Sequence, residues 1–243
     1  MKLAIISDIH GNISALEAAL KELEKQDVNK IICLGDLIGG APFSEQVVQK
    51  IMQIKDKLII VRGNREKYIT EGMPKVVHDE KVVLSQEQLD RHEWMKRQLS
   101  ETTKEYIHTL PKELIYNVEG KKIYIAHYPM KEDGNFRKHI KGASAEENEI
   151  MFSGIDADIY LYGHTHEEIY NSINNKVYIN PGALGCPGET NFAPYGILNI
   201  NKSNIEYQQL YATYDAKKVI EEIERIKFPG YKGTLRVFYG IKE

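Results

Sequence analysis

The chain has 243 residues, with 32 Lys and Arg against 35 Asp and Glu, and its formal net charge is −3. A charge this close to neutral provides no general attraction to nucleic acid or to a membrane surface, so a polymeric nucleic acid is not an expected partner. The two cysteines form no disulfide framework, the start shows no signal-peptide pattern and no apolar run has the length of a membrane span, so we expect a cytoplasmic protein.

The first sixty residues alternate short apolar runs with amphipathic segments. Strands are predicted at residues 2–7, 30–34 and 58–61, and helices at 12–26 and 44–55. Asn12 is the expected N-cap of the first helix, and Ser44 opens the second. A β-α-β-α-β order of this kind predicts a parallel sheet with right-handed crossovers.

Residues 65–112 depart from this alternation. The only strand-like core is Lys81–Leu84, whereas Gln86–Leu99 and Ser100–Leu110 are predicted helices. The stretch is too long for a simple connection. We therefore expect residues 68–112 to form a helical, cap-like insertion near the ligand crevice, within a single domain that spans residues 1–243.

The rest of the chain is rich in strand patterns. A hairpin is predicted at 113–118 and 121–126, a short helix at 144–152, four strands at 167–173, 176–179, 195–200 and 204–211, and a last helix at 214–226. The four strands suggest a second sheet packed against the first, with the last two antiparallel. The tail from Lys227 is basic and aromatic, and no element is assigned to it.

Polar residues follow nearly every apolar run at the point where the predicted strand ends. They are Asp8-x-His10, Gly35-Asp36, Gly63-Asn64, His127 and Gly163-His164-Thr165-His166. The carboxyl ends of the strands form the ligand crevice of an open α/β sheet. Residues two apart on an extended chain face the same side, so Asp8 and His10 can reach one metal, and His164 and His166 repeat this spacing. Oxygen and imidazole donors gathered there predict two metal ions.

The order DxH, GD, GN, H, GHTH resembles that of the calcineurin-like metallophosphoesterases, from residue 1 to about residue 200. Asn180–Ala183 resembles the NPG[SA] turn of the bacterial and archaeal phosphodiesterase branch, and the stretch that holds Trp94 and Leu110-Pro111 resembles the insertion of larger members. With this resemblance we predict an α/β fold: a four-layer α/β/β/α sandwich of two mixed sheets with a helical insertion.

The resemblance also implies a division of ligands. Asp8, His10 and His166 would hold one divalent metal, Asn64, His127 and His164 the other, and Asp36 would bridge them. Such ions lie about 3.5–4 Å apart and share a hydroxide that attacks phosphorus in line. Four imidazoles favour Mn²⁺, Fe or Zn²⁺ over Mg²⁺ or Ca²⁺. The residues expected to act in catalysis are Asp36, Asn64, Arg65 and His127.

Two positions depart from the family pattern. Arg65 stands where the protein-phosphatase branch has a histidine that assists the leaving group. An arginine stays protonated, so it is a poor proton donor, but it can hold a phosphate oxygen. A surface ion pair with Glu66 or another acid is the alternative role for Arg65. Tyr128 follows His127 where the family often has glycine, and it would narrow the site or stack a base.

The function predicted from these residues is that of a dinuclear metal-dependent phosphoesterase. It would hydrolyse phosphodiester or phosphoanhydride bonds of a small, nucleotide-like substrate. One alternative is a phosphomonoesterase or Ser/Thr protein phosphatase; another is a non-catalytic metal-binding scaffold, since a retromer subunit that resembles this family has lost catalytic residues. A nuclease would need a basic groove, which the charge balance does not indicate. The sequence gives no indication of oligomeric state.

Several further residues are weighed as packing or surface groups. Trp94 and Met95 are expected to pack, His78, His92, His108 and His139 to lie in solvent, and Cys33 to be inert in its strand. Cys186 follows the Asn180-Pro181-Gly182 turn closely enough to approach the site, and a structural role is expected for it.

Overall fold

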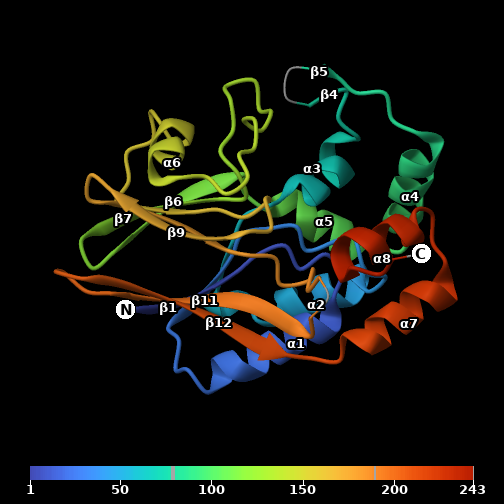
Figure 1. Ribbon diagram of the computed structural model, residues 1–243, viewed down its shortest axis with the longest axis horizontal. Helices are drawn as coiled ribbons and strands as arrows, with labels where there is room; N and C mark the ends of the chain where they lie inside the picture. Colours follow the sequence, from blue (N-terminus) through green and yellow to red (C-terminus); the bar gives the residue numbers. More distant parts are fainter. Residues whose placement is uncertain (78–79, 189, 243) are drawn as a thin grey trace.

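Two five-stranded sheets lie face to face in the computed structural model, which describes residues 1–77, 80–188 and 190–242 (Figure 1). The first sheet has the order β12-β11-β1-β2-β3, with β1 at Lys2–Ile6, β2 at Lys30–Cys33, β3 at Leu58–Ile60, β11 at Phe192–Ile200 and β12 at Ile205–Thr213. The second has the order β6-β7-β8-β10-β9, with β6 at Glu113–Val118, β7 at Lys121–Ala126, β8 at Ile159–Leu161, β9 at Glu168–Ile173 and β10 at Lys176–Pro181.

The first sheet joins the beginning of the chain to its last strands. β1, β2 and β3 are parallel, as predicted, with Ile5 opposite Ile32. β11 is antiparallel to β1 and to β12. The antiparallel return is confirmed, but the assignment of the last two strands to the second sheet is wrong. The residue pattern of a strand shows which of its faces is apolar, but it does not show which sheet the strand joins. Here β11 pairs with the edge of β1.

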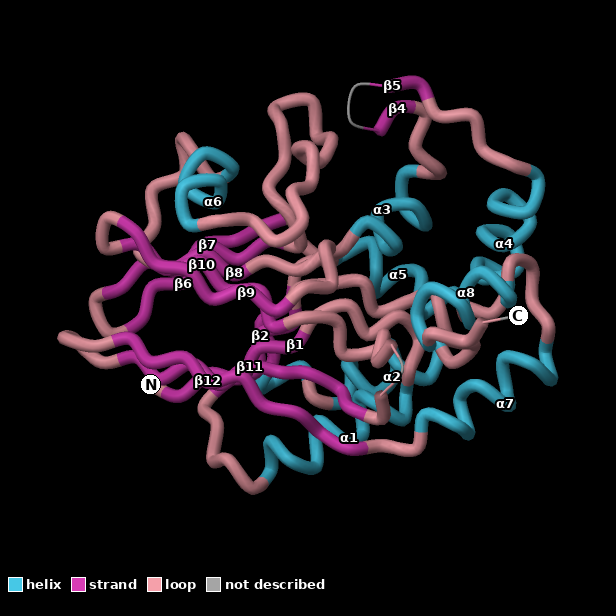
Figure 2. Tube along the Cα trace, viewed as in Figure 1, coloured by secondary structure: helices cyan, strands magenta, loops and turns pink. Residues whose placement is uncertain are grey.

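The second sheet repeats the parallel arrangement at its centre. β7, β8 and β10 are parallel, and the edge strands β6 and β9 are antiparallel to their neighbours. The predicted hairpin of β6 and β7 is confirmed. The loops that follow the parallel strands of both sheets gather at one end, next to α3 and α8 (Figure 2). This end is where the candidate ligands lie.

Successive side chains of each strand point to opposite faces of its sheet, and this alternation produces the layers of the fold. In β1, Leu3 and Ile5 face the second sheet, whereas Ala4 and Ile6 face the helices on the other side. The layer between the sheets is aliphatic and includes Ile32, Leu34, Ile125, Leu161 and Ile179, all of them fully buried. Because successive side chains of a strand point to opposite faces, each sheet contributes to two cores.

The outer layers differ in kind. On the first sheet lie α1 (Ile13–Glu24), α2 (Ser44–Gln53), α5 (Glu101–Thr109) and α7 (Ala216–Ile226), packed through aliphatic side chains. On the second lies α6 (Ala145–Met151), over a cluster of Tyr124, Tyr128, Phe152, Tyr160, Tyr162 and Tyr178. Figure 1 shows α1 and α7 on one side and α6 on the other. The four-layer α/β/β/α prediction is confirmed. No helix within the described ranges is both long and apolar enough to cross a membrane.

The segment after α3 (Asn64–Glu71) holds the two predicted helices, α4 at Gln86–Arg97 and α5. The predicted strand at Lys81–Leu84 is wrong: a small hairpin pairs β4 (Val76–Val77) with β5 (Glu80–Lys81), and Val83 is 93% exposed because no sheet covers it. Residues 78 and 79 lie outside the described part. α5 packs into the core through Ile107, whereas α4 buries only Met95. That residues 68–112 act as a cap stays a prediction.

The C-terminal tail forms a helix that sequence patterns did not reveal. α8 spans Tyr231–Tyr239 and packs against α7. The backbone amide of Gly188 donates to the carbonyl of Phe238 over 2.9 Å, and the Asn12 side chain donates to the Tyr239 hydroxyl over 3.4 Å. These bonds fix the tail beside the loop that follows β1.

Candidate metal centre

The seven predicted ligands converge in two groups at the carboxyl ends of the strands. In the His10 cluster (Asp8, His10 and His166), the Nε2 atoms of His10 and His166 are 3.0 Å apart, and Asp8 Oδ1 is 3.3 Å from His166 Nε2. In the Asn64 cluster (Asn64, His127 and His164), Asn64 Oδ1 lies 2.9 Å from His164 Nδ1 and 3.1 Å from His127 Nε2.

Asp36 lies between the two clusters. Its Oδ2 is 3.7 Å from His10 Nε2, and its Oδ1 is 3.6 Å from His127 Nε2. One carboxylate therefore faces both groups, each with a different oxygen. The residue is buried, with 2% exposure, so water screens this arrangement little.

Most of the ligands have a strained backbone. Positive φ angles occur at Asp8 (53°), His10 (50°), Asp36 (52°), His164 (71°) and His166 (63°). A side chain in the left-handed region costs about 1–2 kcal/mol per residue. Such strain persists only where the surroundings enforce it, and it concentrates at functional sites. Backbone bonds such as His10 N to the Asp36 carbonyl, 2.9 Å, hold the strained loops together.

The carboxylate of Asp8 has one oxygen without a hydrogen bond. Its Oδ2 accepts bonds from the Ser7 hydroxyl, 2.5 Å, and from the His164 amide, 3.0 Å. Its Oδ1 is buried and has no hydrogen-bond partner. Leaving such an oxygen unsatisfied costs about 1–3 kcal/mol or more. Because this oxygen points at imidazole nitrogens, the residues present fit a cation at this place.

Glu66 supports the loop that carries Asp36, and sequence reasoning did not identify it. Its fully buried carboxylate accepts bonds from four backbone amides: Gly63, 2.7 Å; Asp36, 2.9 Å; Leu37, 2.9 Å; and Ile38, 3.2 Å. Burial and the charge of Asp36 raise the pKa of Glu66 to about 7, while the amide donors favour its ionised form. A glutamate three residues after Gly63 is the capping-box signal that could have revealed it.

Backbone carbonyls orient the histidines. His127 Nδ1 donates to the Leu34 carbonyl over 2.8 Å, and His10 Nδ1 lies 3.4 Å from the Ile38 carbonyl. Each ring therefore presents Nε2 to the centre, as in known metal sites where the second nitrogen is anchored. The tautomers are assigned from these bonds.

The NPG turn predicted from the sequence braces the opposite loop. The Asn180 side-chain amide donates to the Gly163 carbonyl over 3.0 Å and to the Thr165 hydroxyl over 3.1 Å. Its oxygen accepts from the Gly182 amide over 3.0 Å. A Cβ added to Gly163 would lie 2.0 Å from Ser7 Oγ, so only glycine fits where this loop passes the β1 loop. The turn thereby fixes the histidines on either side of Thr165.

Burial and neighbouring charges shift the pKa values of these groups in different directions. Burial opposes ionisation of Asp8, yet the neighbouring His127, His166 and His10 hold its pKa well below the usual value. Burial lowers the pKa of His10 strongly and that of His164 to about 3, with nearby histidines adding to both. Burial would also lower the pKa of His166, but the adjacent carboxylate of Asp8 raises it to about 11. The lowered pKa values of His10 and His164 favour the neutral imidazole that a metal ligand must be, whereas a metal at His166 would have to displace its proton.

A cavity of about 270 Å³ opens onto both clusters, and its wall includes Arg65, His139, Lys141 and Phe238. The Nε of Arg65 is buried and has no hydrogen-bond partner. The alternative ion pair between Arg65 and Glu66 is not formed, because the Glu66 oxygens face backbone amides. His139 is exposed, as expected, yet it lines this cavity, and its ring lies 5.8 Å from that of His164.

Tyr128 does not shape the mouth of the cavity. It is fully buried, and its hydroxyl accepts from the Ile140 amide over 3.0 Å, so it cannot stack a base. Its ring lies 5.1 Å from that of His164 and supports it from behind. The expected packing role of Trp94 is confirmed, since it stacks on Phe228 at 4.9 Å between ring centroids.

The remaining expectations concern cysteines and histidines. Cys33 is fully buried in β2, as predicted, whereas the Cys186 sulfur belongs to one group of donor atoms with His10 and His166. His92 is half-buried on α4, and His108 is exposed. His78 lies outside the described residues.

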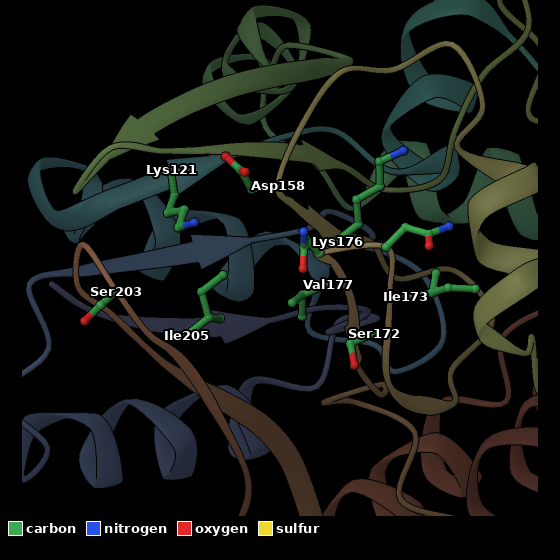
Figure 3. A pocket seen from close by; sticks show the side chains of 10 residues that line it. Lys121, Asp158, Ser172, Ile173, Lys176, Val177, Ser203 and Ile205 are labelled. Carbon is green, nitrogen blue, oxygen red and sulfur yellow. The ribbon is translucent and has the colours of Figure 1, made fainter.

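A larger depression of about 670 Å³ lies at the opposite end of the sheets (Figure 3). Lys121, Asp158 and Lys176 line it, at the amino ends of β7, β8 and β10. None of its described lining residues is a predicted ligand. Because ligands of such sheets bind at the carboxyl ends, the smaller cavity is the candidate site.

Comparison with known proteins agrees with the geometry. Residues 1–203 match the model of the calcineurin-like phosphoesterase superfamily domain. The chain is 28% identical to an uncharacterized protein of Methanocaldococcus jannaschii, over 98% of each chain. It is 23% identical to phosphodiesterase YfcE of Escherichia coli, over 82% of this chain and 88% of that one.

The fold has a counterpart among solved structures. A hypothetical protein from Pyrococcus horikoshii superimposes with a TM-score of 0.83 at 18% identity, and the match covers 100% of this chain and 99% of that one. At this identity the likeness shows the fold. Taken with the family match over residues 1–203, it identifies the chain as a member of the calcineurin-like phosphoesterase superfamily and hence as a hydrolase of phosphoric esters.

Proposed function

We propose that the chain is a dinuclear metal-dependent phosphodiesterase that cleaves phosphodiester or phosphoanhydride bonds of a small, nucleotide-like substrate. The observation that carries this proposal is the position of Asp36, whose two oxygens face two separate ligand clusters, 3.7 Å from His10 Nε2 and 3.6 Å from His127 Nε2. The unpaired, buried Oδ1 of Asp8 supports it, because that atom needs a cation.

The donor set suits borderline metals. The His10 cluster would hold one ion and the Asn64 cluster the other, with Asp36 shared between them. Imidazole nitrogens with a few oxygens suit manganese, iron or zinc. Two such ions would supply positive charge to the phosphoryl oxygens and activate a water for in-line attack on phosphorus.

Arg65 would contact the substrate directly. Its buried, unpartnered Nε and its place in the cavity wall suit a phosphate oxygen, and Lys141 adds a second positive charge to that wall. A guanidinium does not release a proton near neutral pH. The favoured leaving groups are therefore those that need little protonation, such as a phosphate or an aryloxide.

The size of the cavity favours a small substrate. About 270 Å³ accommodates a phosphate and part of a nucleotide, and the walls on both sides of Asp36 are formed by loops rather than by a long groove. The name of the E. coli relative, a phosphodiesterase, supports a diester. A protein phosphatase would have to protonate the alkoxide of serine, for which Arg65 is unsuited.

The proposal is tested by measuring turnover and metal content on the same protein. Protein loaded with Mn²⁺ would be assayed on bis-p-nitrophenyl phosphate, p-nitrophenyl phosphate, a dinucleoside tetraphosphate and a phosphoserine peptide. We expect two metals per chain and turnover of the diester or the anhydride. Asp36→Asn should lose about a thousandfold or more in kcat, the cost of removing one essential charge-stabilising group.

The matched control is Asp56→Asn, which changes an exposed aspartate remote from the site and should leave turnover unchanged. Activity confined to the phosphoserine peptide would replace the proposal with a protein phosphatase. Two bound metals without turnover of any substrate would favour the scaffold.

A further inference from the structure

The thiol of Cys186 lies beside the His10 cluster. Its sulfur and one ring nitrogen each of His10 and His166 all lie within 4.8 Å of one another. A zinc ion has sulfur and nitrogen ligands at about 2.3 Å and about 2.0–2.1 Å, so it spans donors at separations of this order. Neither the family motifs nor the predicted ligand set includes this residue.

We propose that Cys186 is a thiolate ligand of the metal in the His10 cluster, and that this half of the centre therefore selects zinc or a similarly soft ion over manganese. The proposal depends on metal binding at the His10 cluster, which is part of the proposed function. It concerns which atoms hold the ion and which ion they prefer.

A second observation points to a ligand at the same place. Asp8 Oδ1 is buried without a hydrogen-bond partner, 3.3 Å from His166 Nε2 and 3.7 Å from His10 Nε2. Asp8 thus places a carboxylate oxygen beside the same two imidazoles that the thiol approaches, which makes four candidate protein donors. Four nitrogen, oxygen and sulfur donors are the usual complement of a zinc site.

The backbone that carries Cys186 is fixed against the ligand loop. The Gly185 amide donates to the Asp8 carbonyl over 3.0 Å, and the Asn12 side chain donates to the Gly185 carbonyl over 3.3 Å. A Cβ at Gly185 would lie 1.9 Å from the Ile9 carbonyl oxygen, so the two chains touch there. This close approach holds Gly185, the residue before Cys186, against the loop that carries His10.

The tail shields the same side of the centre. The ring of Phe238 lies 5.0 Å from that of His10 and 5.7 Å from that of His166. A ring that covers both imidazoles limits the access of water to the metal and its sulfur ligand. Low dielectric strengthens the attraction between a thiolate and a cation.

With Cys186 as a ligand, the two halves of the centre differ in the softness of their donor atoms. The Asn64 cluster offers an amide oxygen and two imidazoles, whereas the His10 cluster adds a thiol to its imidazoles and carboxylate. Thiolates favour zinc and iron, and oxygen donors are the ones that suit manganese. We therefore expect mixed occupancy when both zinc and manganese are supplied, with zinc in the His10 cluster.

Spectroscopy of the loaded protein tests the ligand without reference to turnover. Cobalt bound by a thiolate gives a sulfur-to-metal charge-transfer band in the near ultraviolet. X-ray absorption of the zinc form shows a sulfur neighbour at about 2.3 Å if the thiolate is bound. Elemental analysis of the same samples gives the number of ions per chain.

Two variants make the assignment specific. Cys186→Ser should remove the band and the sulfur neighbour, and should weaken zinc binding at one of the two sites by about tenfold or more, at least the loss seen for residues that only support ligands. Cys33→Ala removes the only other cysteine of the sequence and should retain both signals.

The outcomes separate this inference from the proposed function. Wild-type protein with two bound ions, diester turnover and no sulfur neighbour would overturn the role of Cys186 and leave the proposed function intact. Because this measurement uses the wild-type protein, it does not depend on whether a variant folds. Protein that takes up no metal would overturn both proposals. A band that survives Cys186→Ser and disappears in Cys33→Ala would also refute the assignment.

Discussion

The two ligand clusters are built in different ways. In the Asn64 cluster, Asn64 is the first residue of α3 and His127 directly follows β7, and neither has a positive φ. In the His10 cluster, Asp8, His10 and His166 all have left-handed backbones. His164, the third member of the Asn64 cluster, also has a positive φ of 71°, so both clusters include loop residues, but only the Asn64 cluster has ligands set directly by a helix and a strand.

Exposure differs between single residues rather than between the clusters, since Asp8 and His10 are buried as well. The side chain of His127 is fully buried, whereas that of His166 is 29% exposed. The His10 cluster also depends on remote support: Asn12, Gly185 and the C-terminal Phe238 all pack around it. We infer that Asn64 and His127 are part of the folding core and that the residues with left-handed backbones, all three of the His10 cluster among them, are held at a cost in stability.

Removing one histidine from each cluster should have the largest effect. His127→Ala and His10→Ala should each reduce bound metal from two ions to one and lower kcat by about a thousandfold or more. His127→Ala should also destabilise the metal-free protein by about 2–4 kcal/mol, because it leaves a cavity and an unpaired Leu34 carbonyl. His10→Ala removes only a longer contact, 3.4 Å to the Ile38 carbonyl, and should cost less.

Elemental analysis, turnover and chemical denaturation of the metal-free variants provide these values, with the exposed His108→Ala as control. Equal destabilisation by the two variants would contradict the distinction between a folding core and a strained half.

Glu66→Gln should have the next largest effect, on both clusters. An amide in place of the carboxylate supplies one acceptor oxygen, so it cannot serve four backbone amides. We expect a loss of about 2–3 kcal/mol in stability from the unsatisfied amides. Because Asp36 lies on that loop, metal affinity should fall about 10- to 100-fold at both sites. Glu71→Gln on the same helix alters only a partly exposed ion pair and should change stability by less than about 1 kcal/mol.

Calorimetric metal titration of the two variants gives the affinities. A Glu66→Gln protein that loses affinity at one site only would show that Asp36 does not bridge.

Phe238→Leu should affect the His10 cluster alone. Leucine is smaller than phenylalanine, so the change removes apolar contacts and should cost about 1–2 kcal/mol. The leucine no longer covers both imidazoles, so the metal of this cluster should dissociate a few times faster while that of the Asn64 cluster is unchanged. Stopped-flow chelation measures the two rates, and Val237→Ala, an exposed change on the same helix, is the control. Equal acceleration at both sites would mean that the tail acts on the whole fold.

The convergence of the candidate ligands could be predicted because local rules position them. Asp8, Asp36 and His127 each follow a strand, and parallel strands bring their carboxyl ends together whatever the rest of the chain does. The spacing of His164 and His166 fixes them on one loop. Correct identification of the strands is therefore enough to predict that these residues lie close together.

The supports could not be predicted in the same way. Phe238 and His10 are 228 positions apart, and nothing in the pattern of the tail indicates which surface it covers. Glu66 is an ordinary first-turn glutamate by sequence, and only the fold shows that a second loop uses the same carboxylate. The strand pattern of β11 predicts a strand but not its sheet, because pairing between distant segments is not encoded in the local sequence.

The smallest predicted effect tests the strain itself. His166→Gly and His166→Ala both remove a ligand, but the φ of 63° at this position is unfavourable for alanine and not for glycine. The left-handed penalty of about 1–2 kcal/mol outweighs the greater flexibility of glycine in the unfolded chain, so the metal-free glycine variant should be more stable by about 0.5–1 kcal/mol. The same pair at His127, where φ is not positive, should show the reverse order. Denaturation midpoints of the four variants decide the point: if alanine is favoured at both positions, the His10 cluster relaxes without its histidine and stores no strain.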